Sequence, residues 1–206
     1  MESKEYHPKE WLYEAVSLTK LCCEDEILDQ VEIYDCEIIG AKLSRSTLKR
    51  WVFENCTFKD SDLSNITFEA CLFDHCHFEG CRLIGSQFSQ SNSQLQQLTF
   101  SHCDLSLSNL SGMNLKGIQL IQCNCSDVDF SHSTLNQAVF QETQVQGALF
   151  EQSNLSQAEL SGALGEQFDP QDTQMSGASV SLNTAIRLVE AMGLKVNTNA
   201  SKETDN

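Results

Sequence analysis

Apolar residues recur at every fifth position over most of the chain. Stepping by five from Ile33 meets an unbroken apolar series to Phe88, and a second series runs from Phe100 to Leu160. Residues five apart are turned by about 140° on an α-helix and lie on opposite faces of a flat strand, so neither element gathers them on one side. The period therefore indicates a chain that turns a corner after every five residues.

A second inward position lies two residues before each apolar centre. It holds mostly small or apolar side chains, such as Cys71, Cys76 and Cys81 in the stretch CLFDHCHFEGCRLIG, and the other positions carry mainly Asp, Asn, Ser, Gln, Glu and Gly. A coil satisfies this pattern when both inward positions fill its interior and the backbone groups of successive coils pair along the axis, about 4.8 Å apart. The pattern predicts an all-β solenoid.

The repeat resembles the unit A(D/N)LXX of the pentapeptide-repeat family, which is legible in SNLSG, SNLSQ, AELSG and CDLSL. This resemblance covers about residues 31 to 182. It implies a right-handed quadrilateral β-helix with four repeats in each coil and about six coils in all.

Three features divide the predicted rod. Residues 1–22 are expected to form an N-terminal cap, because an open β-helix exposes unpaired strand edges. Residues 23–182 are expected to form the β-helix, with an interruption near 89–97 where the step from Phe88 to Phe100 departs from the period. Pro170 falls on a centre position and predicts a distortion of the coil there.

Residues 183–196 are predicted to form a C-terminal module. We expect Asn183 to N-cap a short helix, Gly193 to end it, and Leu194 and Val196 to follow as a short apolar strand. The stretch GASVSLNTAIRLVEAMGLKV resembles the C-terminal module of the Qnr, or quinolone-resistance, branch of the family, which implies an end-to-end homodimer. The residues expected at the dimer contact are Ala185, Leu188, Val189, Met192, Leu194 and Val196. A monomeric cap is the alternative, and residues 197–206 are expected to be a disordered tail.

The chain is strongly acidic, and the charge is uneven along it. The net charge of −16 argues against binding to nucleic acid or to an anionic membrane and indicates a basic partner. Residues 31–82 balance nine acids with six bases, whereas residues 83–172 hold nine acids and one base, Lys116. The latter segment then carries one net charge per about 2.7 Å of rod, against about 1.7 Å along duplex DNA.

These nine acids are the candidate partner-binding residues: Asp104, Asp127, Asp129, Glu142, Glu151, Glu159, Glu166, Asp169 and Asp172. If a coil of about twenty residues keeps its register, six of them fall on two adjacent walls. The six are Asp127, Asp129, Glu151, Glu166, Asp169 and Asp172. A generally soluble acidic surface is the alternative interpretation.

Candidate metal and catalytic groups are few. Cys22-Cys23, Cys123-x-Cys125 and His75-Cys76-His77 bring possible ligands together. Zinc sites typically combine two such pairs at suitable separations, however, and most of the cysteines here occupy the inward spacer position. The sequence has no phosphate-binding glycine loop and no signature of a nucleophile with its base. We therefore predict free thiols, no metal, no cofactor and no enzymatic activity.

Together these features predict a DNA mimic. We expect it to be cytoplasmic, because the N-terminus lacks the apolar core of a signal peptide and no apolar run is long enough to span a membrane. Resemblance to the Qnr branch implies binding to DNA gyrase, a type II topoisomerase, in the saddle that receives duplex DNA, and protection from quinolone-like poisons. Protective members carry a long projecting loop that is missing here, which leaves open weak protection or protection against another poison. The alternative is a non-catalytic scaffold or adaptor for another protein.

Overall fold

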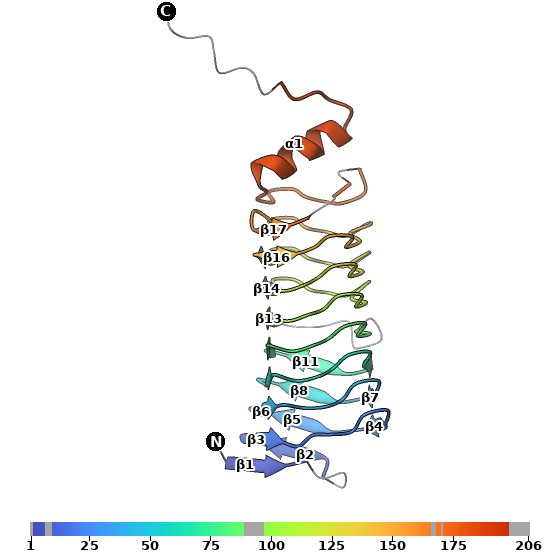
Figure 1. Cartoon of the computed structure of the whole chain (residues 1–206), viewed down its shortest axis with the longest axis vertical. Coiled ribbons are helices and arrows are strands. Elements are labelled where there is room, and N and C mark those ends of the chain that lie inside the picture. The colour runs from blue at the N-terminus through green and yellow to red at the C-terminus, as the bar shows by residue number, and fades with distance from the viewer. Residues whose placement is uncertain (1, 7–9, 89–96, 166–167, 170, 198–206) are drawn as a thin grey trace, which may run out of the picture.

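The computed structural model of the chain is a rod whose two ends lie far apart (Figure 1). It describes residues 2–6, 10–88, 97–165, 168–169 and 171–197. Within these ranges the chain winds into a β-helix in which every strand pairing is parallel. The predicted all-β quadrilateral solenoid is confirmed.

Each coil contributes one short segment to each of four walls, which we number in chain order. The first wall holds β2 (Leu12–Glu14), β5 (Glu32–Tyr34), β8 (Val52–Glu54) and β11 (Leu72–Asp74). The second wall holds β1 (Glu2–Glu5), β3 (Val16–Thr19), β6 (Glu37–Ile39), β9 (Thr57–Lys59), β12 (His77–Glu79), β13 (Thr99–Ser101), β14 (Gln119–Ile121) and β15 (Val139–Gln141).

The other two walls are built mainly from single bridges. The third wall runs from the Cys22–Lys42 bridge to the Asn124–Gln144 bridge and ends in β16 (Thr143–Gln144) and β17 (Ala163–Leu164). The fourth wall holds β4 (Ile27–Asp29), β7 (Thr47–Lys49) and β10 (Thr67–Glu69), and bridges continue it through Gln87, Asn109, Asp129 and Leu149. On these walls, the acids of the C-terminal half therefore extend from short bridge segments that repeat once in each coil.

From β2 onward the register between described neighbouring coils is twenty residues, except at one step. Phe58 pairs with Phe78, and Phe100 pairs with Leu120, but Phe78 pairs with Phe100, twenty-two residues on. The predicted interruption near 89–97 falls almost wholly outside the described residues, yet its flanks show that two extra residues are absorbed within a single coil.

Stacked apolar centres fill the interior. Phe78 is fully buried, and its ring centroid lies 4.6 Å from that of Phe58 and 4.7 Å from that of Phe100, with nearly parallel planes. Offset stacking at this spacing adds to the gain from burying the rings. The period of five therefore becomes columns of side chains one coil apart.

Hydrogen bonds to the preceding coil explain why the sequence places Cys, Ser and Thr at the spacer positions. The thiol of Cys56 donates to the carbonyl oxygen of Ile33 in the preceding coil at 3.2 Å, and the hydroxyl of Thr143 donates to that of Leu120 at 2.9 Å. A small side chain with a weak or strong donor can satisfy this buried oxygen without occupying the volume that the centres need. The spacers therefore contribute hydrogen bonds as well as packing.

The coil register extends back into the segment expected to cap the rod. Leu12 pairs with Glu32, and Tyr13 is a buried centre, so the rod has more coils than the six expected. β1 then adds a strand beyond the first full coil. The ring of Tyr6 packs against Tyr13 and Trp51, with centroids 5.9 and 6.2 Å away, over this end of the apolar interior.

At the other end, α1 (Leu182–Ala191) lies across the rod (Figure 1). Its N-cap is Ser181, whose hydroxyl accepts the N–H of Thr184 at 3.1 Å, so the prediction of Asn183 as the cap is wrong. Gly193 follows the helix with a φ of +81°, as its predicted role in ending the helix requires. No helix in the described ranges is long and apolar enough to cross a membrane.

Two further expectations concern this end. Leu194 and Val196 lie in a segment without regular secondary structure, so the single chain does not contain the predicted strand. Pro170 lies outside the described residues. The Asn154–Gln174 and Glu159–Ser179 bridges each join a residue before it to a residue after it, and both have the register of twenty.

Candidate functional site: an acidic wall

Most corners of the coil within the described ranges carry a residue with positive φ. Asp127 has a φ of 56° and His132 a φ of 59°, and glycine takes the place at Gly147. Such backbone suits Gly, Asn and Asp best, which explains part of the polar composition of the corners. A corner residue therefore adds its charge to the edges of the two walls that meet there.

In the N-terminal half, ion pairs between neighbouring coils neutralise part of the charge. The pairs are Arg45–Asp25, Lys49–Glu69, Arg50–Asp29, Lys59–Glu37 and Arg82–Asp62. Burial alone would raise the pKa of Asp62, but hydrogen bonds from Ser64 and the ion pair with Arg82 lower it overall. Each exposed pair contributes little to stability, and residues 31–82, with nine acids and six bases, keep a net charge of only −3, whereas residues 1–30 hold eight acids against three bases.

In the C-terminal half, neutral groups take the place of those bases. The side-chain amide of Asn124 donates to Asp104 at 3.0 Å, that of Gln122 donates to Glu142 at 2.8 Å, and the backbone N–H of Ser131 donates to Asp129 at 2.8 Å. From residue 97 onward, no acid in the described ranges forms an ion pair with a base. The negative charge of the C-terminal half is therefore available to a partner.

The structure gathers five of the predicted acids on one wall. Asp129 and Glu151 lie on the fourth wall, Asp127 lies at its corner with the third wall, and Asp169 and Asp172 line a hollow on the fourth wall together with Glu151. We call these five residues the acidic wall. The expected pair of adjacent walls thus narrows to a single wall with its edges.

The other predicted acids lie apart from it. Asp104 is on the third wall, Glu142 is at the corner between the second and third walls, and Glu159 is on the second wall. The hydroxyl and N–H of Ser161 lower the pKa of Glu159. Glu166 lies outside the described residues.

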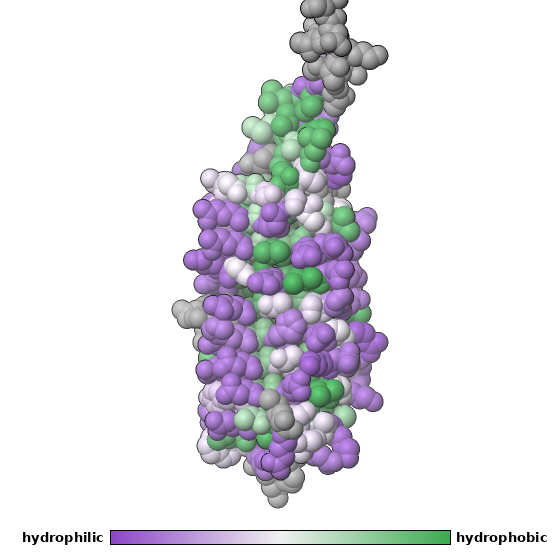
Figure 2. Space-filling view, turned by 90° about the vertical axis from the view of Figure 1, so that its left-hand side faces the viewer, coloured by the Kyte–Doolittle hydropathy of each residue, from purple (hydrophilic) through white to green (hydrophobic). Residues whose placement is uncertain are grey.

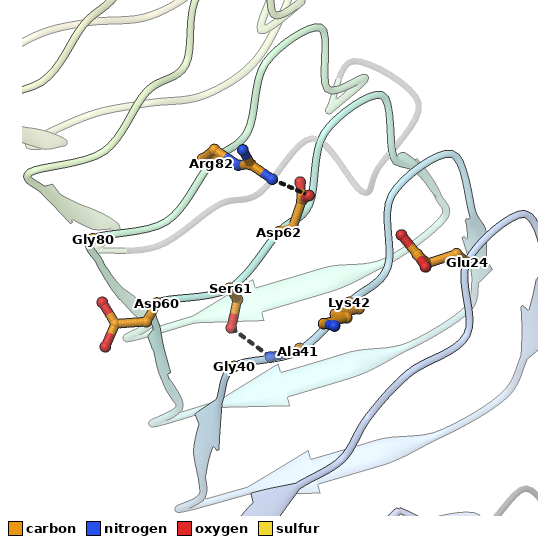
Figure 3. A pocket seen from close by; sticks show the side chains of 9 residues that line it. All are labelled: Glu24, Gly40, Ala41, Lys42, Asp60, Ser61, Asp62, Gly80 and Arg82. Atoms are coloured by element: carbon orange, nitrogen blue, oxygen red, sulfur yellow. Dashed lines mark hydrogen bonds and ion pairs between the residues drawn. The ribbon is translucent and has the colours of Figure 1, made fainter.

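Two hollows mark the surface. One, of about 360 Å³, lies on the acidic wall and is lined by Leu149, Glu151, Asp169 and Asp172 over Ala148 and Phe150. The other, of about 560 Å³, lies on the third wall of the N-terminal half (Figure 3). Its lining mixes Lys42 and Arg82 with Glu24, Asp60 and Asp62, so it favours neither sign of charge. Only the first hollow belongs to a surface of one sign.

The possible metal ligands are dispersed. His75, His102 and His132 are exposed at three different corners, and nine of the ten cysteines are buried. The structure brings no group of three His, Cys, Asp or Glu side chains together around a possible metal position within the described ranges. The thiols therefore serve the packing described above.

Burial should make these thiols unreactive in the folded protein. It raises the pKa of Cys56 and of Cys71 to about 12. Hydrogen bonding with Cys103 lowers the pKa of Cys81 and Cys123, but all three are buried, so access limits their reaction.

With a thiol-specific chromogenic disulfide at pH 8, we expect only the exposed Cys22 to react rapidly, and all ten cysteines to react after unfolding. Cys22→Ser should abolish the rapid phase. Several rapidly reacting thiols in native Cys22→Ser would contradict the buried assignment.

Comparison with known proteins agrees with this architecture. A family description, "Pentapeptide repeat region", matches residues 31–94 and 93–169. The chain belongs to the pentapeptide-repeat family. A search of curated protein sequences finds no match.

Two solved structures of another pentapeptide-repeat protein share the fold. Full-length QnrB1, described as a plasmid-mediated fluoroquinolone resistance protein, superposes with a TM-score of 0.59 at 16% identity, over 89% of this chain and 100% of that one. A trypsin-treated variant of QnrB1 gives a TM-score of 0.52 at 16% identity, over 90% of this chain and 97% of that one. At this identity the likeness establishes the shared pentapeptide-repeat architecture and nothing about the surface.

Proposed function

We propose that this pentapeptide-repeat protein binds a type II topoisomerase, DNA gyrase, as a mimic of duplex DNA, and that it modulates the enzyme and protects it from quinolone-like poisons. The observation that carries the proposal is the acidic wall, whose carboxylates have no basic partners among the described residues of the chain. QnrB1, which is described as a fluoroquinolone resistance protein, shares the fold, and this supports protection from quinolone-like poisons by analogy.

The spacing of the charges supports mimicry. The five carboxylates of the acidic wall occupy three successive coils, which are about 4.8 Å apart, and so present charge at a density comparable to that of duplex DNA. The rigid rod holds these carboxylates in place, so little conformational entropy is lost when they bind a cationic groove. Attraction of this kind mainly raises the association rate, and it weakens with salt.

The apolar surface of α1 supports a homodimer joined at the C-terminal ends. Among the predicted contact residues, Met192 and Leu194 are 61% and 58% exposed, while Ala185, Val189 and Val196 are half-buried. Leu188 instead packs partly against the rod's own interior. Figure 2 shows hydrophobic side chains gathered over this end. End-to-end joining would place the two acidic walls near the centre of the dimer.

A supercoiling assay with purified gyrase tests the function. Adding micromolar protein is expected to inhibit supercoiling, and lower amounts are expected to reduce the cleavage complexes that a fluoroquinolone stabilises. No change in either measurement would remove gyrase as the partner and favour an adaptor for another protein.

The double substitution Met192→Asp and Leu194→Asp should convert a dimer to a monomer, because it places two charges in the buried centre of the proposed contact. Light scattering should report half the mass of the unsubstituted protein. Glu190→Gln, an exposed change in the last turn of α1, is the control and should leave the mass unchanged. If the double variant keeps the mass of a dimer, the contact lies elsewhere.

A further inference from the structure

The acidic wall also carries two exposed leucines. Leu149 is 48% exposed and pairs with Asp129 on the fourth wall, and Leu107 is 62% exposed at the corner one coil before Asp127. A Cβ atom on Gly147 would collide with Oδ1 of Asp127, so this glycine gives the Asp127 carboxylate room beside Leu149. Along the rod, a pair of carboxylates is thus flanked by an apolar side chain on either side.

Leu107 is anomalous in its backbone as well. Its φ is +62°, and among the described residues with positive φ it is the only large apolar side chain. The same corner column holds Asn65, Gly85 and Gly147, which suit this conformation. An exposed leucine there adds strain without adding to the core, and such outliers are a reason to look for a function.

We propose that Leu107, Asp127, Asp129, Leu149 and Glu151 form one mixed contact surface, which we call the leucine–carboxylate surface. Its occupant is a cationic protein surface that places apolar side chains among its Lys and Arg residues. This rests on the proposed function, with gyrase supplying that surface. The two leucines lie about two coils, or roughly 10 Å, apart, so two separate apolar groups of the partner meet them.

The charges identify the kind of occupant. The surface's carboxylates have no basic partner in the described part of the chain, and desolvating them against anything but a cation would be unfavourable. The leucines add a contact that the sugar-phosphate backbone of duplex DNA cannot make. The protein would therefore differ from DNA in part of what it touches, which can give it selectivity between cationic grooves.

The two kinds of contact should respond differently to salt. Ion pairs at a surface are screened as ionic strength rises, whereas burial of apolar area is not. Removing carboxylates should flatten the dependence of affinity on salt, and removing leucines should lower the affinity by a similar factor at every salt concentration.

The test measures the affinity of purified gyrase for the full-length protein between about 0.05 and 0.5 M salt, where screening changes strongly. Leu107→Asn combined with Leu149→Asn is expected to weaken binding on the order of tenfold or more throughout, with an unchanged salt slope. Asp127→Asn combined with Asp129→Asn is expected to reduce the slope. Asn accepts a positive φ, so Leu107→Asn should preserve or raise the stability, which thermal unfolding checks.

The matched control is Ile27→Thr. Ile27 is 70% exposed and occupies the same place in the repeat on the same wall as Leu149, but it lies near the N-terminal end of the rod, several coils from the acidic wall. Its replacement should leave the affinity unchanged.

The outcomes separate the two proposals. If the unsubstituted protein does not bind gyrase, the proposed function fails, and this inference fails with it. If that protein binds and the folded leucine variant binds equally well, only the leucine–carboxylate surface is refuted. A leucine variant that changes the salt slope without lowering high-salt affinity would also refute it, because the leucines would then act only through the charges.

Discussion

Replacing Phe78 with alanine is expected to destabilise the rod by about 3–5 kcal/mol. Phe78 is fully buried between the parallel rings of Phe58 and Phe100, so its loss leaves a cavity in the middle of a stack and removes both stacked contacts as well as a tilted contact with Phe73. Regular backbone hydrogen bonds join the neighbouring coils, so these coils cannot move far into the cavity.

Phe78→Leu is the control, because the same column already holds aliphatic centres at Leu18, Ile38 and Leu120. Its loss of stability should be clearly smaller. Urea unfolding followed by circular dichroism measures both, with a second probe near the chain ends because long repeat arrays can unfold in parts. Equal effects of the two variants would mean that ring stacking and cavity size do not govern this site.

Neutralising the acidic wall is expected to have the largest effect on binding to gyrase. The triple variant Asp127→Asn, Asp129→Asn and Glu151→Gln removes three unbalanced charges at almost constant volume. At low salt we expect the affinity to fall on the order of a hundredfold, because each charge-assisted contact across a desolvated interface contributes at least a few-fold. Inhibition of supercoiling should be lost in parallel. Asn is suited to the positive φ at position 127, so folding should be preserved.

A triple variant in the other half controls for net charge. Glu54→Gln, Asp60→Asn and Glu79→Gln remove the same charge from acids that form no ion pair in the described structure. This variant should bind gyrase nearly as well as the unsubstituted protein. Equal losses in both variants would show that overall charge, and not the acidic wall, attracts the partner.

Most of the fold could be predicted because the period of five is incompatible with the two common secondary structures. The same counting could have been carried back through Leu28, Cys23, Leu18 and Tyr13, which are all buried centres. The register of twenty is implied by the resemblance to the pentapeptide-repeat family, with four repeats in each coil, and it is what brings Asp129 and Glu151 to one wall.

Other features depended on contacts that a local pattern does not contain. Ser181 and Asn183 are both good N-caps, and only the course of the chain after Ser179 decides between them. The pairing of Arg45 with Asp25 shows in the sequence only as charges twenty residues apart. The strain at Leu107 required the backbone angle, although a leucine at a corner position is itself a visible departure from the repeat.

The recovery of register after residue 88 bears on how such a rod can change over time. Two surplus residues shift the pairing of one turn, and every later turn resumes the common spacing. In an ordinary sheet, two surplus residues inside a strand would keep the faces but would shift every later pairing of that strand by two residues. Each coil of this rod can absorb extra residues by itself. Insertions of different length can therefore arise in one coil during evolution while the other coils keep their pairing.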